Sequence, residues 1–289
     1  MADNELVLVR EEVEPTGPVT SDAQMIDLWL RGRSPHTRRA YAADAEQFLQ
    51  ALGKPLPEVR QSDVQAFVDS LATVAPNTRR RHLAVVRSLL ACAWRVGYLR
   101  ASVGIELRPP RQPSPPAEPA LTEEEVARLI ALETNPRNRV LLRVFYEVGA
   151  RVSEVCALTW EDVAAQSDGT VLVTLRSKGR ARVVPLPAPL SGALLALRGD
   201  ADATAPVFAS RRGGALTPVQ AHRVVRQAAV RAEIAGDVSP NALRRAHASH
   251  ALARGVPIES VAATLGHASV STTGQYRHAR AEAQLSLPL

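Results

Sequence analysis

The chain has 289 residues, a formal net charge of +6 and two cysteines, so it can bury a substantial core and is expected to form one large domain or two smaller ones. Cys92 and Cys156 lie far apart and outside any CxxC or His cluster, which argues against a disulfide framework and against a metal site. No apolar run approaches the roughly 18 residues of a membrane span, and the first twenty residues are acidic rather than a basic-then-apolar leader, so a cytoplasmic protein is expected.

The charge is distributed unevenly, with −4 in residues 1–20, +6 in residues 21–111 and +4 in residues 112–289. The acidic segment 1–20 is expected to be a flexible tail. Both remaining parts are basic, which is compatible with a nucleic-acid partner because Lys and Arg neutralise phosphates. An Arg-rich composition that only solvates the surface would give the same charge.

The first predicted domain, residues 21–108, is all helical. The sequence LRPPRQPSPPAEPA that follows has too many prolines for a helix, which predicts an extended linker over residues 109–118. Within the domain, most of the helical patterns start near a capping residue or proline and end at or near Gly. Helices are expected over residues 22–32, 34–53, 60–72 and 75–97.

Two of these helices open alike, with SPHTRRAY and APNTRRRH. In each, a proline and a threonine are followed by paired arginines, so that helix N-terminal amides and guanidinium groups would lie together, an arrangement that suits a DNA phosphate. The same arginines could be ordinary solvated helix positions. The candidate DNA contacts are Thr37, Arg38, Arg39, Thr78, Arg79 and Arg80.

The second predicted domain, residues 119–289, is mainly helical with one small antiparallel sheet. The sequence 135–163 is expected to form two helices that are separated at Gly149. Alternating apolar residues predict a strand hairpin over 169–187, around a Ser-Lys-Gly-Arg turn. Further helices are expected over residues 121–133, 216–234, 239–255, 258–266 and 271–284.

The hairpin turn holds Lys178, one of only two lysines in a chain with 33 arginines. Lys can release its proton when a neighbouring charge or burial lowers its pKa, whereas Arg stays protonated. A chain that supplies its other positive charges as Arg is therefore expected to keep Lys where a proton is transferred, although an exposed lysine without a role would look the same. Arg180 in the same turn is a further candidate DNA contact.

Two helix starts in this domain combine positive charge with capping residues. Arg151 follows Gly149 and has Glu154 three residues on, close enough to hold the guanidinium, as a purely structural ion pair would also do. The helix that begins with SPNALRR has a Ser N-cap, and Asn241 and Arg244 are expected to project together from its N-terminus, a natural place for an anion.

The last motif is LGHASVSTTGQYRHA, residues 265–279. His267 follows the glycine that ends one predicted helix, and Tyr276 lies about a turn inside the next. The chain has only four tyrosines, and this one stands in a short polar helix next to Arg277 and His278. A surface aromatic side chain packed on a neighbour would fit the same pattern.

Together these residues resemble the tyrosine recombinase, or phage integrase, family. Arg151 in GARVSE, Lys178 in the hairpin, Arg244 in NALRRAHASH, His267 in LGHASVSTT and Tyr276 in QYRHA occur in the family's order and spacing. The resemblance covers nearly the whole chain from about residue 21, and in length the chain is similar to the Xer recombinases. It implies an all-α, SAM-like core-binding domain followed by an α+β catalytic domain.

The resemblance implies a role for each residue. The two arginines would bind the non-bridging oxygens of a scissile phosphate and stabilise the transition state, with Glu154 supporting Arg151. Tyr276 would be the nucleophile and form a 3′-phosphotyrosyl intermediate that preserves the bond energy, so that no metal, ATP or other cofactor is needed. His267 would hydrogen-bond the phosphate, and Lys178 would protonate the departing 5′ oxygen as general acid.

The sequence departs from the family pattern at one position of this site. Most relatives have His-x-x-Arg-His where this chain has Asn241 and, after Arg244, Arg245. Asn can donate a hydrogen bond to a phosphate but cannot accept the tyrosine proton. Slower cleavage, or deprotonation by water or another group, is therefore expected.

The resemblance also implies partners. Two duplexes and four protomers would take part, so double-stranded DNA with paired half-sites and a homo-tetramer, or a hetero-tetramer with a paralogue, are expected. Such an enzyme would act at the nucleoid, in chromosome dimer resolution or in integration and excision of mobile elements. Two alternatives stay open, namely DNA relaxation of the type IB topoisomerase kind and a DNA-binding relative whose catalysis is weakened at Asn241.

Overall fold

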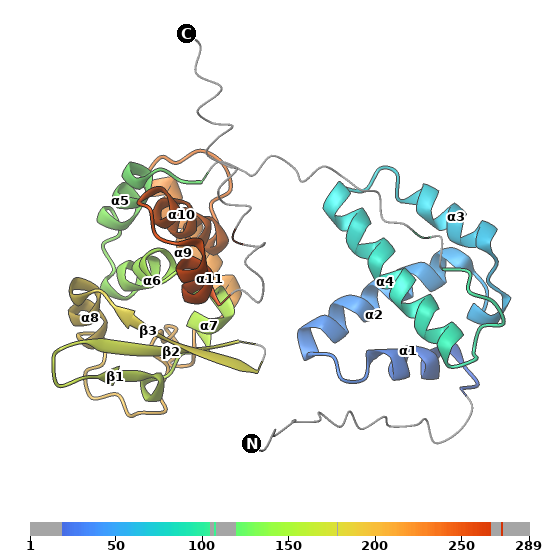
Figure 1. Ribbon diagram of the computed structural model, residues 1–289, viewed down its shortest axis with the longest axis horizontal. Coiled ribbons are helices and arrows are strands. Elements are labelled where there is room, and N and C mark those ends of the chain that lie inside the picture. The colour runs from blue at the N-terminus through green and yellow to red at the C-terminus, as the bar shows by residue number, and fades with distance from the viewer. Residues whose placement is uncertain (1–18, 105–106, 108–119, 178, 267–272, 274–289) are drawn as a thin grey trace, which may run out of the picture. The chain divides into compact units, whose positions relative to one another are not determined.

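In the computed structural model the chain divides into two compact units, Met1–Pro113 and Ser114–Leu289, and each is described by itself (Figure 1). The structure describes residues 19–104, 107, 120–177, 179–266 and 273. The division falls within the proline-rich segment 109–118. That segment, and residues 1–18 of the predicted acidic tail, lie outside the described residues.

The described part of the N-terminal unit is helical, as predicted. Ser34 caps α2 by accepting a hydrogen bond from the Thr37 amide, and α2 ends at Gly53, whose φ of +63° is a left-handed conformation that glycine adopts without the penalty of a side chain. The helices are α1 Asp22–Leu30, α2 Pro35–Leu52, α3 Gln61–Ser70 and α4 Pro76–Arg95, with a 3-10 turn at Leu56–Glu58.

Aromatic side chains hold this unit together. Phe48 of α2 meets Phe67 of α3 edge to face, with ring centroids 4.9 Å apart. Trp29 stacks on Tyr41 at 5.5 Å, and the Arg33 guanidinium lies 5.0 Å from the first ring and 4.7 Å from the second. These contacts join α1, α2 and α3 around one core, so the unit has its own hydrophobic centre.

The described part of the C-terminal unit is mostly helical around one small sheet. Its helices are α5 Glu123–Ala131, α6 Pro136–Glu147, α7 Val152–Cys156, α8 Ala188–Leu195, α9 Pro218–Arg231, α10 Pro240–Ala253 and α11 Ile258–Leu265. Helix α10 packs on α6, and α11 packs on α10 through Ala248, Val261 and Leu265. This arrangement carries the end of α11 to the start of α7, where the candidate site lies (Figure 1).

The sheet has three antiparallel strands in the order β1 Val163–Ala165, β2 Val171–Ser177, β3 Arg180–Leu186. The predicted hairpin is confirmed, since the register pairs Val173 with Val184 and continues to the pair Ser177 and Arg180. Alternate residues of β2 are buried, as expected for a sheet with one face on the core. Lys178 falls between the last paired residues in the sequence and lies outside the described residues.

Two elements differ from the sequence-based expectation. The helix expected after Gly149 ends already at Cys156. The chain then continues through a 3-10 turn at Trp160–Asp162 into β1, a strand that was not predicted and that adds to the predicted hairpin of β2 and β3. Backbone hydrogen bonds from Trp160 and Glu161 to residues 205 and 203 explain the change, because they hold this segment against a distant loop. Helix α8 was not predicted, because its Pro- and Gly-containing sequence lacks a clear helical period.

None of the helices in the described ranges is both long and apolar enough to cross a membrane.

Candidate active site

The first part of the site is the turn between α6 and α7. Gly149 takes a left-handed φ of +63°, which redirects the chain so that Arg151 becomes the N-cap of α7. The Arg151 amide donates to Glu154 Oε2 at 2.7 Å, and Arg151 Nη1 donates to Glu154 Oε1 at 2.8 Å. The predicted contact of Arg151 with Glu154 is therefore confirmed, with the carboxylate engaging both the backbone and the side chain.

Arg244 enters the same region from α10. Its side chain is buried, with 5% of the residue exposed, and its Nη1 donates to the Gly149 carbonyl while Nη2 donates to the Leu265 carbonyl at 2.7 Å. Backbone oxygens thus fix the guanidinium from two sides before any ligand is present. Such preorganisation lowers the cost of binding an anion, because the donors need not be reoriented.

The C-terminal end of α11 is the point at which three arginines meet. Arg182 Nε donates to the Thr264 carbonyl at 2.7 Å, Arg244 to the Leu265 carbonyl, and Arg151 Nη2 to the Gly266 carbonyl at 2.8 Å. The last carbonyls of a helix have no partner within it and carry partial negative charge. Each of these three successive carbonyls therefore receives a cationic donor from a different element.

Arg182 was missed by the sequence analysis. It lies on β3, and its Nη1 and Nη2 donate to the two oxygens of Glu154 at 2.6 and 2.9 Å. Burial alone would raise the pKa of Glu154, but the hydrogen bonds from Arg182 and Arg151 outweigh it and hold that pKa below the usual value. In the sequence Arg182 is only the third basic residue of KGRAR, and no local spacing indicates that it contacts Glu154.

The charges of this cluster do not cancel. Arg151 and Arg182 share the carboxylate of Glu154, and Arg244 donates to the carbonyls of Gly149 and Leu265. The four side chains therefore carry three positive charges and one negative charge, an excess of two positive charges. Arg151 also keeps 32% of its side chain exposed. A partly open position with two spare positive charges suits a phosphate group.

Gly149 is required at its position for a steric reason as well. A Cβ atom added there would lie 2.6 Å from Leu265 Cδ2 and 3.0 Å from His247 Cδ2, and Leu265 is fully buried. We expect Gly149→Ala to lower the free energy of unfolding of the C-terminal unit by about 2–4 kcal/mol, the sum of left-handed strain and overpacking. Urea unfolding followed by circular dichroism measures the change.

The matched control for this variant is Gly169→Ala. Gly169 has a φ of +82°, but an added Cβ would meet nothing within 4 Å, so only the backbone strain of about 1 kcal/mol is expected. Equal losses in the two variants would mean that the contact with Leu265 is unimportant.

His247 lies beside Arg244 and contacts the turn at Gly149. Burial, opposed by a hydrogen bond to the Tyr146 backbone and assisted by the charge of Arg244, lowers the pKa of His247 from 6.5 to about 4. The folded protein therefore holds this imidazole neutral near pH 7. The His247 side chain therefore adds no charge to the anion site.

This shift predicts a pH dependence of stability. Between pH 6.5 and pH 4 the unfolded chain binds a proton at His247 that the folded chain does not bind, so stability is full above pH 6.5 and falls as the pH decreases. From pH 7 to pH 4.5 the free energy of unfolding should fall by about 2 kcal/mol more in the wild type than in His247→Gln. Urea titrations at both pH values test this, and parallel losses in the two proteins would contradict it.

The other residues predicted for this domain are less closely grouped. Asn241 is exposed in the first turn of α10, whereas Arg244, three positions further on, is buried and donates to the carbonyls of Gly149 and Leu265. That the two project together towards one anion stays a prediction. Arg180 is exposed at the start of β3. Lys178, His267 and Tyr276 lie outside the described residues.

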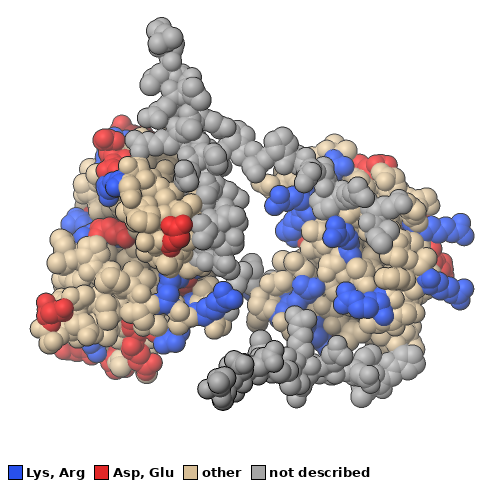
Figure 2. Space-filling view, in the orientation of Figure 1, with Lys and Arg blue, Asp and Glu red and all other residues tan. Residues whose placement is uncertain are grey.

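The predicted DNA contacts of the N-terminal unit fall at the starts of α2 and α4. Arg39 and Arg80 are exposed, whereas Arg38 is paired with Asp27 of α1. Arg79 is half-buried, and its Nε finds no hydrogen-bond partner in the part of the chain that the structure covers. Thr37 shares a 2.9 Å hydrogen bond with the Ser34 hydroxyl, and Thr78 is half-buried. Basic side chains are spread over the face of this unit seen in Figure 2.

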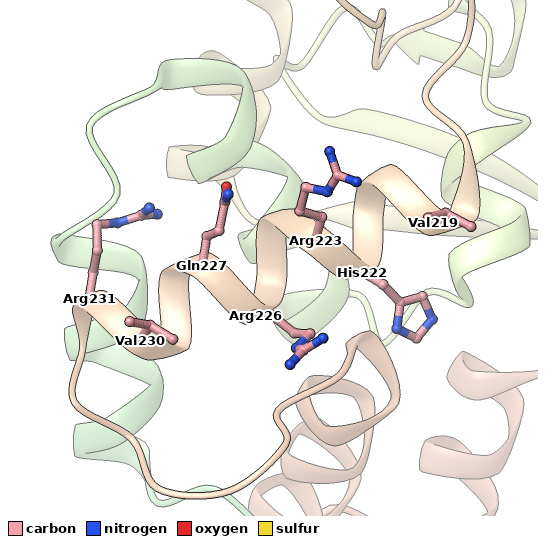
Figure 3. A pocket seen from close by; sticks show the side chains of 7 residues that line it. All are labelled: Val219, His222, Arg223, Arg226, Gln227, Val230 and Arg231. Atoms are coloured by element: carbon pink, nitrogen blue, oxygen red, sulfur yellow. The ribbon is translucent and has the colours of Figure 1, made fainter.

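A basic surface on α9 was also missed. The inner positions of α9, such as Val224 and Val225, are buried, and the opposite side lines an open groove (Figure 3). The sequence contained a signal for this surface, because the residues on the outer side of α9 recur at helical spacing. The residues lining the groove are Val219, His222, Arg223, Arg226, Gln227, Val230 and Arg231.

No group of three or more His, Cys, Asp or Glu side chains that could hold a metal ion occurs among the residues whose placement is described. Glu154, the carboxylate at the centre of the site, is fully occupied by two arginines.

Comparison with protein families matches both units of the chain. The profile of the phage integrase family matches residues 119–283, and the profile of the phage integrase N-terminal SAM-like domain matches residues 25–97.

Individual relatives agree with these matches. The chain is 33% identical over 258 residues to tyrosine recombinase XerC of Xanthomonas campestris pv. campestris, which covers 85% of this chain and 79% of the relative. It is 34% identical over 277 residues to tyrosine recombinase XerD of Mycobacterium tuberculosis, which covers 85% and 88%.

Solved structures show the same fold. The XerA recombinase is 27% identical with a TM-score of 0.52, and the match covers 92% of this chain and 97% of that one. A lambda integrase dimer bound to a COC′ core site is 17% identical with a TM-score of 0.72, and the match covers 91% and 79%.

Proposed function

Because the chain belongs to the phage integrase family of tyrosine recombinases, we propose that it is a site-specific DNA recombinase that breaks and rejoins duplex DNA through a 3′-phosphotyrosyl intermediate. The observation that carries the proposal is the convergence of Arg151 and Arg244 on adjacent carbonyls at the end of α11. This end is followed directly in the sequence by His267.

The chemistry assigns each residue a step. Arg151 and Arg244 bind the non-bridging oxygens of the scissile phosphate and stabilise the additional charge of the pentavalent transition state. Tyr276 attacks phosphorus and displaces the 5′ oxygen, which receives a proton from Lys178, and His267 donates a hydrogen bond to the phosphate. The new phosphotyrosyl bond keeps the energy of the broken phosphodiester, so attack by a 5′ hydroxyl reverses the step without ATP.

Asn241 distinguishes this site from the His-x-x-Arg pattern of most relatives. Its amide can donate a hydrogen bond to the phosphate but cannot take the tyrosine proton. His247 does not replace the missing base, because it lies half-buried on the inner side of α10 and is packed against Gly149. The tyrosine proton is therefore expected to leave to water or to the phosphate.

Two basic surfaces are suited to hold the duplex. One consists of the arginines at the starts of α2 and α4, of which Arg38, Arg39 and Arg80 are exposed. The other is the outer side of α9, where Arg223 and Arg226 line the groove (Figure 3). A helix of this width fits the major groove of B-DNA. Arginine contacts of this kind make binding strongly dependent on salt.

The assembly proposed is a tetramer on two duplexes with paired half-sites, made of this chain alone or with a paralogue. A related fold has been solved as a lambda integrase tetramer bound to a Holliday junction, and another as XerH bound to its difH substrate. By analogy the enzyme would act at the nucleoid in the cytoplasm. Chromosome dimer resolution and mobile-element integration or excision both fit this reaction.

Covalent trapping tests the proposal. The protein is incubated with sheared host DNA, denatured with detergent, and the fragments that stay attached to protein are captured and sequenced. We expect enriched fragments with the wild type and none with Tyr276→Phe, because the phenyl ring has no nucleophilic oxygen. The enriched sequences would also identify the recombination site.

Other outcomes separate the alternatives. If two labelled duplexes exchange strands, the enzyme is a recombinase, whereas relaxation of one supercoiled circle without exchange would assign it to the topoisomerase type. Salt-sensitive DNA binding without any adduct would contradict the catalytic proposal and favour a DNA-binding relative weakened at Asn241.

A further inference from the structure

Arg182 makes more side-chain contacts with the site than a surface arginine would. Its Nη1 and Nη2 form a bidentate ion pair with the two oxygens of the Glu154 carboxylate, at 2.6 and 2.9 Å. Its Nε donates to the Thr264 carbonyl at 2.7 Å. A fork-to-fork pair of this kind fixes the plane of the carboxylate as well as its position. The orientation of Glu154 therefore depends on β3.

Hydrogen bonding and exposure distinguish Arg182 from Arg151. All three of its guanidinium nitrogens have protein partners, and only 14% of the side chain is exposed. Arg151 shares the same carboxylate but keeps 32% of its side chain exposed. Arg182 is thus placed to support the site and not to touch the DNA.

The shared carboxylate links the two arginines. Glu154 is completely buried, so its charge must be satisfied by the groups around it. While Arg182 occupies both oxygens from one side, Arg151 needs to supply only one side-chain hydrogen bond and its amide. Without Arg182 the carboxylate would turn towards Arg151, and the Arg151 guanidinium would leave its present orientation.

The position of Arg182 in the chain adds a second link. It follows Lys178 by four residues on the same hairpin, and its partner Thr264 precedes His267 by three. One side chain therefore connects the strand after the proposed general acid, the carboxylate behind Arg151 and the backbone before His267. Gly266 lets the Arg182 guanidinium lie close to the backbone at this point, because a Cβ atom at residue 266 would lie 3.1 Å from Arg182 Nη1.

We infer that Arg182 is a positioning residue that sets the orientation of Arg151 through Glu154. The inference rests on the proposed function, since the effect of Arg182 is exerted on the binding of the scissile phosphate.

The first test compares Arg182→Met with Arg176→Met. Arg176 lies on the neighbouring strand opposite Ala181 and also pairs with a carboxylate, Asp162, but 68% of its side chain is exposed. In single-turnover cleavage at saturating protein, Arg182→Met should be about 100-fold slower, the order expected for a displacement of about 1 Å, with half-site affinity unchanged. Arg176→Met should cleave at the wild-type rate. Equal rates for all three proteins would overturn the inference.

A double-mutant cycle separates positioning from general damage. If Arg182 acts through Arg151, then adding Arg182→Met to Arg151→Lys should slow cleavage by less than about threefold. A full additional 100-fold loss would show that Arg182 acts elsewhere. Arg182→Lys serves if the methionine variant does not fold, since it keeps the charge but loses the fork. It should retain the wild-type thermal midpoint and still cleave more slowly.

A measurement on the free protein keeps the inference testable if the wild type forms no adduct. The side-chain nitrogen signals of Arg151, assigned by their loss in Arg151→Lys, report the rotation of its guanidinium group. We expect their shift and rotation rate to change in Arg182→Lys and to stay unchanged in Arg176→Met. Unchanged signals in both variants would refute the positioning role, whereas a missing adduct with the expected signals would refute only the proposed function.

Discussion

Arg244→Met is expected to reduce the rate of covalent DNA cleavage by about 1,000-fold, the upper range for loss of one preorganised donor to a transition-state oxygen. The guanidinium is buried and held by the carbonyls of Gly149 and Leu265, so water or a neighbouring side chain cannot readily take its place. Single-turnover formation of the protein–DNA adduct measures this rate, at protein concentrations that saturate the half-site.

The control for this variant is Arg254→Met at the C-terminal end of the same helix. Arg254 pairs with Glu123 on the surface, with side chains 62% and 49% exposed, and it is not expected to touch the phosphate. Its removal should leave the cleavage rate within a factor of two. A decrease of less than tenfold in Arg244→Met would show that Arg244 does not stabilise the transition state.

Glu154→Ala is expected to destabilise the C-terminal unit by about 3–5 kcal/mol, because it leaves the partly buried arginines 151 and 182 without their shared counter-charge. The Glu154 side chain is fully buried, so solvent does not compensate for its loss. Urea unfolding at pH 7 gives the difference in free energy.

The matched control is Glu123→Ala, which removes the carboxylate of the exposed pair with Arg254. Exposed pairs contribute at most about 1 kcal/mol, so a change below that value is expected. Similar losses in the two variants would indicate that the Glu154 network stabilises no more than a surface ion pair.

Local patterns in the sequence were sufficient for most of the secondary structure. Proline and glycine mark the ends of α2 and α4, and the alternation of apolar residues marks the hairpin of β2 and β3. Such signals are read within one or two turns of the chain, and their energetics are local. The third strand and the early end of α7 were not predicted, because backbone hydrogen bonds to residues 203 and 205 decide them.

The contacts of the candidate site also fall into those that local spacing predicts and those that it does not. The contact between Arg151 and Glu154 was predicted because Glu154 follows Arg151 by three positions, the spacing of neighbours on one helical turn. The contact between Glu154 and Arg182 joins residues 28 apart, and that between Arg151 and Gly266 joins residues 115 apart. No local spacing encodes these pairs.

The sequence by itself therefore determined the family, most of the elements and the identities of the residues proposed to act on the scissile phosphate. Only the tertiary structure decided that Arg182 shares the Glu154 carboxylate and that three arginines converge on the end of α11. The physical reason is that a buried charge and the unpaired carbonyls of a helix end must find partners wherever the packed elements bring donors within hydrogen-bonding distance. Which donors those are depends on how α10, β3 and α7 pack.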